Sequence, residues 1–278
     1  MNAKNNSNTP PGLAAQDAPA GRWTVLIPFY NERDYLPRTL RSLCEQSLPP
    51  SHFILVDNAC TDDSVALARA VLHDYPHIDA RIMHEPRPGK IQAMQCGLKA
   101  VTTPFVATCD ADTWYPPDYL AKADALFAVR PDAASVMAID IYNAPQTLAA
   151  RLKRLKTRLA ACLLAHQCHT GGFGQMFRTA ALRRCGGFDA RLWPFVLEDH
   201  EIIHRLLDTG PSVYHQNLWC MPADRRTNGA RVSWRLSERV LYHLVPRRFQ
   251  GWFFYRFLAT RLRKRRLDNT ALRERNWA

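Results

Sequence analysis

The chain has 278 residues, of which 47% are hydrophobic, and a formal net charge of +12. A chain of this size and composition can bury a sizeable core, which argues against a disordered or fibrous protein. No run of about 18 apolar residues occurs, so we expect no membrane-spanning helix. Eight cysteines are scattered without a C-x-x-C pair. Their scatter favours a reducing, cytoplasmic setting and argues against a disulfide framework or a zinc site.

The positive charge belongs to the C-terminal end of the chain. Residues 225–278 hold 15 basic and three acidic side chains, a net +12, while residues 1–224 sum to zero. Residues 1–21 are rich in Asn, Ala, Pro and Ser and lack the apolar core of a secretory signal, so we expect them to be disordered. The basic C-terminal segment needs an explanation separate from that of the region before it.

Between residues 22 and 141, strand-like and helix-like segments alternate. The helix-like segments carry apolar residues three and four positions apart, as Leu36, Leu40 and Leu43 do. Strands are predicted at residues 24–29, 53–56, 80–84, 105–109 and 134–139, and helices at residues 34–46, 62–74, 90–100 and 117–128. This alternation predicts an α/β fold whose mostly parallel open sheet carries helices on both faces.

After residue 141 the alternation stops. Residues 147–166 predict a basic amphipathic helix, because five leucines at helical spacing form one stripe and five basic residues flank it. A glycine loop at Gly171-Gly172 leads into a predicted strand, and Glu198-Asp199 stand at the start of another helix. The leucines of the stripe are Leu148, Leu152, Leu155, Leu159 and Leu163.

Polar side chains follow the ends of several predicted strands. The fourth strand ends abruptly in Asp110 and Asp112, one residue apart. Parallel strands share a carboxyl edge, where open α/β sheets bind their ligands. Two carboxylates there repel each other unless a cation lies beside them, and their hard oxygens suit Mg²⁺ or Mn²⁺ bridging to a phosphorylated substrate. The alternative is a strand-to-turn junction whose aspartates cap the next helix.

The other strand ends supply groups that suit a nucleotide. Tyr30 can lie against a base, and Asp57 can accept a hydrogen bond from a base or ribose. Lys90, after Arg87-Pro-Gly89, can supply a cation for phosphate near a helix amino terminus. Taken singly, each has a structural alternative: Tyr30 as a core aromatic, Asp57 in a turn, Lys90 as a solvated charge.

The ordered set of motifs resembles family 2 glycosyltransferases over residues 23–226. The motifs are Pro28-x-Tyr30-Asn31-Glu32, Asp57-Asn58, Gly89-Lys90, Asp110-Ala-Asp112, Gly171-Gly172 with Arg178, and Glu198-Asp199. The resemblance implies a GT-A fold over residues 22–224, with a nucleotide-binding half at 22–141 and an acceptor half at 142–224. Residues 225–278 then form a basic, aromatic-rich helical tail.

The resemblance also implies a reaction. A sugar would move with inversion from a nucleotide-diphosphate donor, such as a UDP-, GDP- or dTDP-sugar, to the hydroxyl of a saccharide or lipid-linked acceptor, in surface glycan or glycolipid biosynthesis. Asp110 and Asp112 would hold Mn²⁺ or Mg²⁺ on the donor, Asp199 would be the general base, and Glu198 would orient the loop or acceptor. Pro28, Tyr30, Glu32, Asp57 and Lys90 would contact the donor, and Gly171 and Gly172 would form a loop beside it.

One motif of many polymer-forming relatives, Gln-x-x-Arg-Trp, is missing, so we expect no processive synthesis. Arg225, in Asp224-Arg225-Arg226, is the remaining candidate for a contact with the leaving diphosphate. A catalytically silent nucleotide-sugar binding protein is the alternative function. The retained Asp110, Asp112 and Asp199 argue against it.

The C-terminal tail interleaves bulky aromatics with arginines, as in Trp252-Phe-Phe-Tyr-Arg256. This pattern is typical of a helix at a membrane interface, so one interpretation is peripheral contact with anionic lipid on the inner face of the cytoplasmic membrane. Packing of the aromatics onto the catalytic domain is the equal alternative. Nucleic-acid binding is the third interpretation and is not expected.

Overall fold

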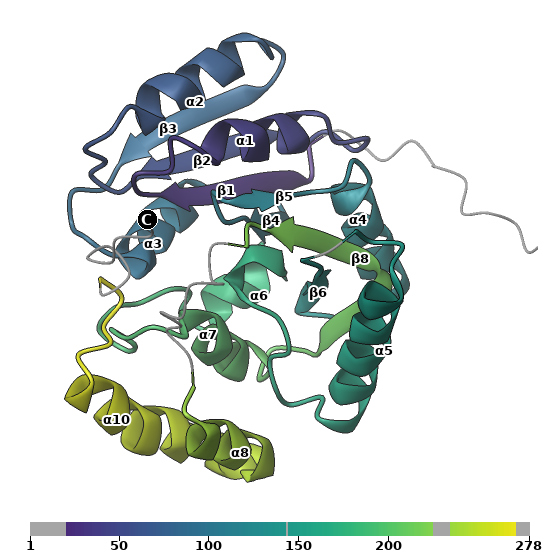
Figure 1. Ribbon diagram of the computed structural model, residues 1–278, viewed down its shortest axis with the longest axis vertical. Coiled ribbons are helices and arrows are strands. Elements are labelled where there is room, and N and C mark those ends of the chain that lie inside the picture. The colour runs from purple at the N-terminus through teal and green to yellow at the C-terminus, as the bar shows by residue number, and fades with distance from the viewer. Residues whose placement is uncertain (1–20, 143, 225–233, 271–278) are drawn as a thin grey trace, which may run out of the picture.

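The computed structural model describes residues 21–142, 144–224 and 234–270. Within these residues one eight-stranded sheet runs through the molecule in the order β3-β2-β1-β4-β7-β6-β8-β5. Strands β3, β2, β1 and β4 are parallel, β7 is antiparallel to both of its neighbours, and β6 and β8 are parallel to each other. Figure 1 shows helices on both sides of this sheet. The expected α/β fold with a mostly parallel sheet is confirmed.

The first half of the chain is a regular β-α alternation. It consists of β1 (Trp23–Phe29), α1 (Leu36–Cys44), β2 (His52–Asp57), α2 (Ser64–His73), β3 (Asp79–His84), α3 (Lys90–Ala100), β4 (Phe105–Thr108), the short β5 (Thr113–Trp114), α4 (Tyr119–Val129) and β6 (Ser135–Asp140). The expected strands and helices are present with shifts of a few residues at their ends. Helix ends are the least regular part of such patterns.

The second half departs from this alternation. It contains α5 (Leu148–Leu163), a 3-10 turn at Gly172–Gly174, β7 (Gln175–Arg178), α6 (Thr179–Arg184), α7 (Glu198–Leu206) and β8 (Ser212–Pro222). The sequence did not predict β8, the longest strand, because its middle carries the polar residues His215, Gln216 and Asn217, which interrupt any apolar run.

The core forms on both faces of the sheet, and β1 shows why. Val25 and Ile27 belong to one buried cluster with α1 and α4, while Leu26 between them belongs to another with α3 and α7. Successive strand residues point to opposite faces, so a strand covered on both sides needs an apolar residue at every position. Apart from Thr24, whose hydroxyl is hydrogen-bonded to that of Thr103, the fully buried run from Trp23 to Phe29 meets this need.

The C-terminal extension is helical, as expected. It contains α8 (Leu236–Leu244), a 3-10 turn at Arg247–Phe249, the single turn α9 (Gln250–Trp252), a π-helical stretch at Phe253–Leu258 and α10 (Ala259–Lys264). Figure 1 shows α8 and α10 at the end of the molecule beyond α7. Within the described residues, no helix combines the length and hydropathy that crossing a membrane requires.

Part of this extension packs into the same core as α3 and α7. Phe253, Phe254 and Leu258 are fully buried in that cluster. The Tyr255 hydroxyl donates a 2.5 Å hydrogen bond to Glu201 on α7. For these residues the packing alternative is confirmed, whereas Phe249 and Trp252 are each half exposed.

Candidate active site

The loops after β1 and β2 are joined by side-chain hydrogen bonds. Asn31, held at a positive φ of 52°, exchanges hydrogen bonds with Thr61 at 2.8 and 3.0 Å. At the end of β2, Asp57 accepts from the Cys60 amide at 2.8 Å and pairs with His84 at 2.7 Å. Burial alone would raise the pKa of Asp57, but these hydrogen bonds outweigh it and hold the pKa below its usual range. Asp57 therefore stays ionised at this edge of the sheet.

A buried asparagine fixes the loop that carries Lys90. The Asn58 side chain donates to the carbonyls of Glu85 and Arg87 and accepts from the Gly89 amide at 2.8 Å. Gly89 has a φ of 126°, and a Cβ there would meet the side chain of Asn269. A glycine is required at this position because both its conformation and its surroundings exclude a side chain. The loop therefore delivers Lys90 to the start of α3 in one defined direction.

Lys90 lies in a cluster of carboxylates. Its ammonium donates to Asp110 Oδ1 at 2.6 Å and lies 3.6 Å from Glu198 Oε1. Burial opposes the charge, but the nearby carboxylates outweigh it and raise the pKa of Lys90 above its usual range. This cation joins the end of β4 to the start of α7. The cavity lined by Lys90, Asp110, Glu198 and Asp199 holds only about 10 Å³, so the side chains nearly fill it.

The pKa values of the two neighbouring carboxylates of α7 are shifted in opposite directions. Burial is the largest effect on Glu198 and raises its pKa, although Lys90 opposes this. Burial acts on Asp199 in the same direction, but His200 and Lys90 outweigh it and lower the pKa of Asp199. Asp199 is therefore the better candidate for a base that is ionised before the reaction, and Glu198 holds a proton more readily.

His200 belongs to this site, although no motif in the sequence includes it. Its backbone amide and its Nδ1 both lie 2.9 Å from Asp199 Oδ1. Among the described residues, no hydrogen bond reaches the second oxygen, Oδ2. The His200 ring packs against Trp234 and Tyr242, with ring centroids 5.3 and 5.8 Å apart. The C-terminal extension thus supports the side chain that orients Asp199, and no local pattern in the sequence signals this contact.

The Gly171-Gly172 loop closes over this cluster. A Cβ on Gly172 would lie 3.2 Å from Lys90 Nζ and 3.6 Å from Asp199 Cβ, so the glycine permits a close approach. The buried Tyr115 hydroxyl donates to the Phe173 carbonyl and accepts from the Asp110 amide, which ties the loop to the end of β4.

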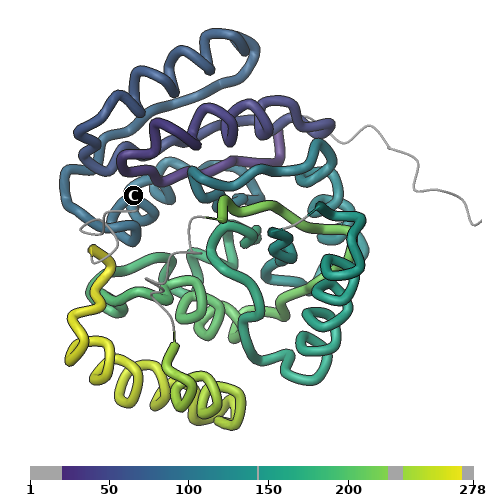
Figure 2. The backbone as a smooth tube through the Cα atoms, in the orientation of Figure 1, coloured from purple at the N-terminus to yellow at the C-terminus, as the bar shows by residue number. Residues whose placement is uncertain are grey.

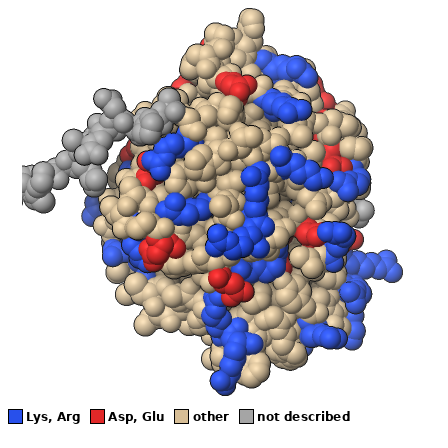
Figure 3. Space-filling model, turned by 180° about the vertical axis from the view of Figure 1, so that it is seen from behind, with Lys and Arg blue, Asp and Glu red and all other residues tan. Residues whose placement is uncertain are grey.

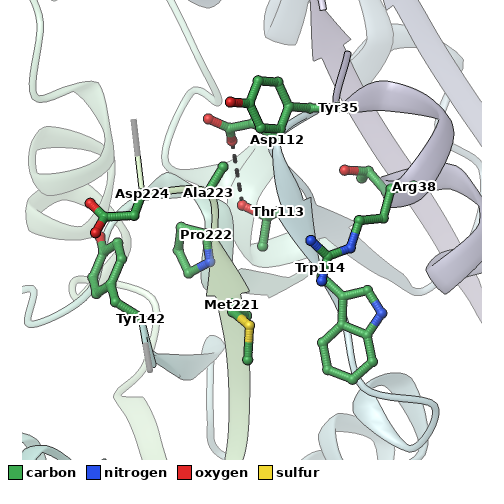
Figure 4. A pocket seen from close by; sticks show the side chains of 11 residues that line it. Tyr35, Arg38, Asp112, Thr113, Trp114, Tyr142, Met221, Pro222, Ala223 and Asp224 are labelled. Carbon is green, nitrogen blue, oxygen red and sulfur yellow. Dashed lines mark hydrogen bonds between the residues drawn. The ribbon is translucent and has the colours of Figure 1, made fainter. Parts of the chain in front are cut away.

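Asp112 faces a different cavity from Asp110. The Thr113 amide donates to the Asp110 carbonyl at 3.4 Å, so the chain turns between the two aspartates. Asp112 lines a pocket of about 160 Å³ together with Tyr35, Arg38, Tyr142 and Asp224. Figure 4 shows Asp112 beside Tyr35, with Asp224 beside Tyr142 across Ala223 and Pro222. The pocket thus combines two carboxylates, an arginine and aromatic rings.

The structure brings some of the expected site residues together and separates others. Lys90, Asp110, Gly172, Glu198 and Asp199 form the first group, which we call the lysine cluster. Asp112 belongs to the second group, which we call the aspartate pocket. Pro28 on β1, Tyr30 and Glu32 in the loop after β1, and Asp57 at the end of β2 line neither cavity. Gly171, which precedes the 3-10 turn, lines neither cavity as well. Arg225 lies outside the described residues.

Carboxylates gather at the site without forming a closed metal cage. Among the residues that the structure describes, no three His, Cys, Asp or Glu side chains lie close enough together to hold a metal ion by themselves. Asp112 and Asp224 share one pocket. Mg²⁺ and Mn²⁺ are commonly held by one or two carboxylates, with substrate phosphates and waters completing the shell. The donor set at the aspartate pocket fits such an open site.

Comparison with known sequences identifies the family. A sequence model described as glycosyl transferase family 2 matches residues 24–186, more than half of the chain. Glycosyltransferase YibD of Escherichia coli is 33% identical over 89 residues, which cover 32% of this chain and 25% of that protein. TuaG of Bacillus subtilis, whose name includes teichuronic acid biosynthesis, is 34% identical over 102 residues, 36% of this chain and 39% of the relative.

A relative whose name includes a lipid carrier matches the same region. An undecaprenyl-phosphate 4-deoxy-4-formamido-L-arabinose transferase of Sodalis glossinidius is 33% identical over 103 residues, 36% of this chain and 31% of that protein. The matches thus span about a quarter to two fifths of these relatives' length.

Comparison with solved structures confirms the fold. The mannosyltransferase PcManGT of Pyrobaculum calidifontis, solved with GDP-Man and Mn²⁺, superposes with a TM-score of 0.64 at 23% identity, over 87% of this chain and 65% of that one. TarS of S. aureus, solved with UDP-GlcNAc, superposes with a TM-score of 0.56 at 16% identity, over 85% and 71%. These likenesses confirm a GT-A type fold with a C-terminal helical extension.

Proposed function

The chain belongs to glycosyl transferase family 2 and is a glycosyltransferase, and from this premise we propose that it moves a sugar, with inversion, from a nucleotide-diphosphate donor to an acceptor hydroxyl. The observation that carries the proposal is the division of the carboxylates. Asp199 is an ionised, oriented carboxylate in the lysine cluster, while Asp112 lines the separate aspartate pocket. A single displacement needs a base on one side of the sugar and a site for the leaving diphosphate on the other.

On the donor side, Asp112 is a proposed ligand of Mn²⁺ or Mg²⁺ in the aspartate pocket, where Asp224 joins it on the wall. Asp110, which faces the lysine cluster, is the second proposed ligand and would reach the metal with Oδ2 while its Oδ1 stays paired with Lys90. The metal would stabilise the charge that develops on the leaving diphosphate. Lys90 holds Asp110 in place through its 2.6 Å ion pair. Pro28, Tyr30, Glu32 and Asp57 remain the proposed contacts of the nucleotide, and Arg225 that of the diphosphate. A GDP-Man complex and a UDP-GlcNAc complex among the similar folds support a nucleotide-sugar donor.

On the acceptor side, Asp199 would take the proton of the attacking hydroxyl. A positioned carboxylate base typically accelerates such a step about 10²–10⁴-fold. The two hydrogen bonds from His200 hold Oδ1, which orients the carboxylate and directs Oδ2 to the acceptor. Glu198 would orient the acceptor beside it. Gly171 and Gly172 would let the loop close over the reacting groups.

The relatives support a role in surface glycan or glycolipid synthesis. One has a name that includes undecaprenyl phosphate and another a name that includes teichuronic acid biosynthesis. We therefore propose a saccharide or lipid-linked acceptor and a cytoplasmic location at the inner face of the membrane. The exposed Phe249 and Trp252 of the C-terminal extension, with the arginines beside them, support peripheral contact with anionic lipid.

A panel of UDP-, GDP- and dTDP-sugars tests the function directly. We expect one donor class to raise the melting temperature of the purified protein in the presence of Mn²⁺ or Mg²⁺, and we expect slow release of that nucleoside diphosphate. A donor that binds without any release, with a full range of acceptors, would show a silent binding protein instead. Absence of stabilisation by every donor would contradict both functions.

A further inference from the structure

Helix α5 presents its most apolar face to the outside. Leu148, Leu152, Leu155, Leu159 and Leu163 are between 52% and 81% exposed. The helix instead packs through Ala150 and Thr157, which are buried. At 100° per residue these two lie roughly opposite the leucines. An amphipathic helix of a globular protein normally turns its apolar stripe toward the core, so this orientation is reversed.

Nothing else in the described part of the chain covers this face. Figure 2 shows α5 along one edge of the molecule, with no other described segment beyond it in that view. Its inner side packs on β8, where Arg154 stacks on Trp219 with 5.6 Å to the ring centroid and Arg158 donates to Gln216. These contacts fix the rotation of the helix, so the leucines cannot turn inward without breaking them.

The charge on α5 indicates what the stripe meets. The helix carries five basic residues and no acidic one. Arg151 and Lys156 are exposed on the two sides of the leucines. A second copy of the chain would bring two such cationic borders together, and like charges at close range repel. A surface with anionic headgroups above an apolar layer matches both the border and the stripe.

We propose that α5 is a membrane-docking helix that lies in the headgroup region of an anionic bilayer with its leucine stripe inserted. The leucines enter the apolar layer, while Arg151 and Lys156 remain at the level of the phosphates. This contact needs no rearrangement of the protein, because the leucines are already exposed.

A second helix with exposed apolar residues, α8, contacts the chain just after α5. The Gln167 side chain, after the end of α5, donates to the Tyr242 carbonyl at 2.9 Å and accepts from His243 at 2.6 Å, both at the end of α8. On α8, Leu236, Val240 and Leu244 are also exposed. Seen from behind, Lys and Arg cover more of the surface than Asp and Glu do (Figure 3). Two exposed apolar helix faces are therefore joined at one corner of a basic molecule.

Docking through α5 would also bring the active site to the membrane. Tyr142, which lines the aspartate pocket, lies six residues before the helix begins. A lipid-linked acceptor could then reach the site without leaving the bilayer, a consequence that rests on the proposed function. Vesicle binding itself does not depend on the chemistry.

Flotation of the full-length protein with vesicles tests the proposal. We compare phosphatidylcholine vesicles with vesicles containing phosphatidylglycerol, using wild type and the double variant Leu155→Gln/Leu159→Gln. Glutamine keeps the helix propensity and removes the apolar surface. A matched control is Val129→Gln/Leu192→Gln, which changes two side chains that are 66% and 50% exposed elsewhere on the surface.

We expect wild type and the control to bind the anionic vesicles, less strongly as salt rises, and the α5 variant to bind about tenfold less or weaker still. Equal binding of the α5 variant would overturn the proposal and leave the C-terminal extension as the contact. No binding by wild type would overturn it as well, and a wild-type dimer that the α5 variant loses would assign the stripe to a second copy. Donor hydrolysis without vesicles should be the same in all three proteins, so its loss would concern the proposed function and not the docking.

Discussion

The lysine cluster and the aspartate pocket arise from the same strand end, yet they provide different chemistry. In the lysine cluster, Lys90 neutralises Asp110 and contacts Glu198, and little space remains. In the aspartate pocket, Asp112 and Asp224 face a cavity of about 160 Å³. In a continuous strand, residues two positions apart point to the same face, so Asp110 and Asp112 would lie on one side of the sheet. The turn that follows β4 separates them, so that Asp110 pairs with Lys90 while Asp112 faces the open cavity.

The largest effect should come from removing the base. Asp199→Asn keeps the shape of the side chain but cannot accept a proton, so we expect turnover to fall about 10²–10⁴-fold while donor affinity is unchanged. Steady-state kinetics and donor calorimetry separate the two quantities. Asp208→Asn is the control, because Asp208 lies just beyond the same helix and is 76% exposed. Near-normal turnover in Asp199→Asn would remove this residue from the mechanism and point to Glu198.

A change in the aspartate pocket should instead affect the binding of the donor. Loss of a residue that supports a metal ligand typically weakens metal binding about 10–100-fold. We expect Asp112→Asn to weaken metal-dependent donor binding by at least as much. The fold should be preserved, because the side chain lines a cavity. Donor calorimetry with Mn²⁺ and with excess chelator makes the comparison. If wild type binds the donor equally well with chelator, the assignment of a metal to this pocket is wrong.

Removing the cation of the lysine cluster should affect stability and pH dependence together. Lys90→Met leaves Asp110 and Glu198 without their positive partner. We expect this to lower the free energy of unfolding by about 1–3 kcal/mol. Losing the cation also raises the pKa of Asp199, so the base is protonated at a higher pH and the acid limb of kcat/KM moves upward. Urea unfolding and a pH-rate profile measure these two effects.

A surface ion pair of equal length provides the control for Lys90. Lys122 and Asp118 are also 2.6 Å apart, but they lie at the surface at the start of α4, with 33% and 50% of their side chains exposed. We expect Lys122→Met to change the free energy of unfolding by no more than about 0.5 kcal/mol and to leave the pH profile unchanged. If the two variants behave alike, Lys90 has no special role in the cluster.

The smallest effect should follow from loosening the orientation of Asp199. His200→Phe keeps the ring against Trp234 and Tyr242 but removes the Nδ1 donor, while the backbone amide still holds Oδ1. We expect kcat to fall about tenfold with an unchanged KM, and the acid limb to move upward because Asp199 loses a hydrogen bond to its charged form. His200→Asn, which retains a donor, should recover part of the loss. An unchanged pH profile in His200→Phe would reduce His200 to a packing residue.

Much of the site could be anticipated because its residues stand at predictable points of a repeating pattern. Asp57 ends β2, and Asp110 follows β4. Glu198 begins α7. Strand and helix ends follow from local periodicity, so these positions were accessible without a structure. Lys90 also begins a predicted helix, but its pairing with Asp110 and Glu198 could not be predicted, because Asn58 and Gly89 direct its loop through contacts between distant parts of the chain.

The residues that sequence reasoning missed act across long separations. His200 bonds its neighbour Asp199, but the residues that hold its ring, Trp234 and Tyr242, come from the C-terminal extension. The sequence placed that extension apart from the catalytic domain, as a basic tail. The domain boundaries themselves stay a prediction, but part of the extension shares the core of α3 and α7.

By itself, the sequence determined the alternating helices and strands of the first half, the helix α5 and the resemblance to the family, because these depend on local spacing and on motifs in order. It also determined that α5 and the C-terminal extension each combine apolar with basic residues. Only the tertiary structure decided which apolar groups are buried: Phe253 and Phe254 are fully buried, whereas the leucines of α5 are exposed. The physical reason is that periodicity defines the faces of a helix, whereas the direction of each face depends on the elements that pack against it.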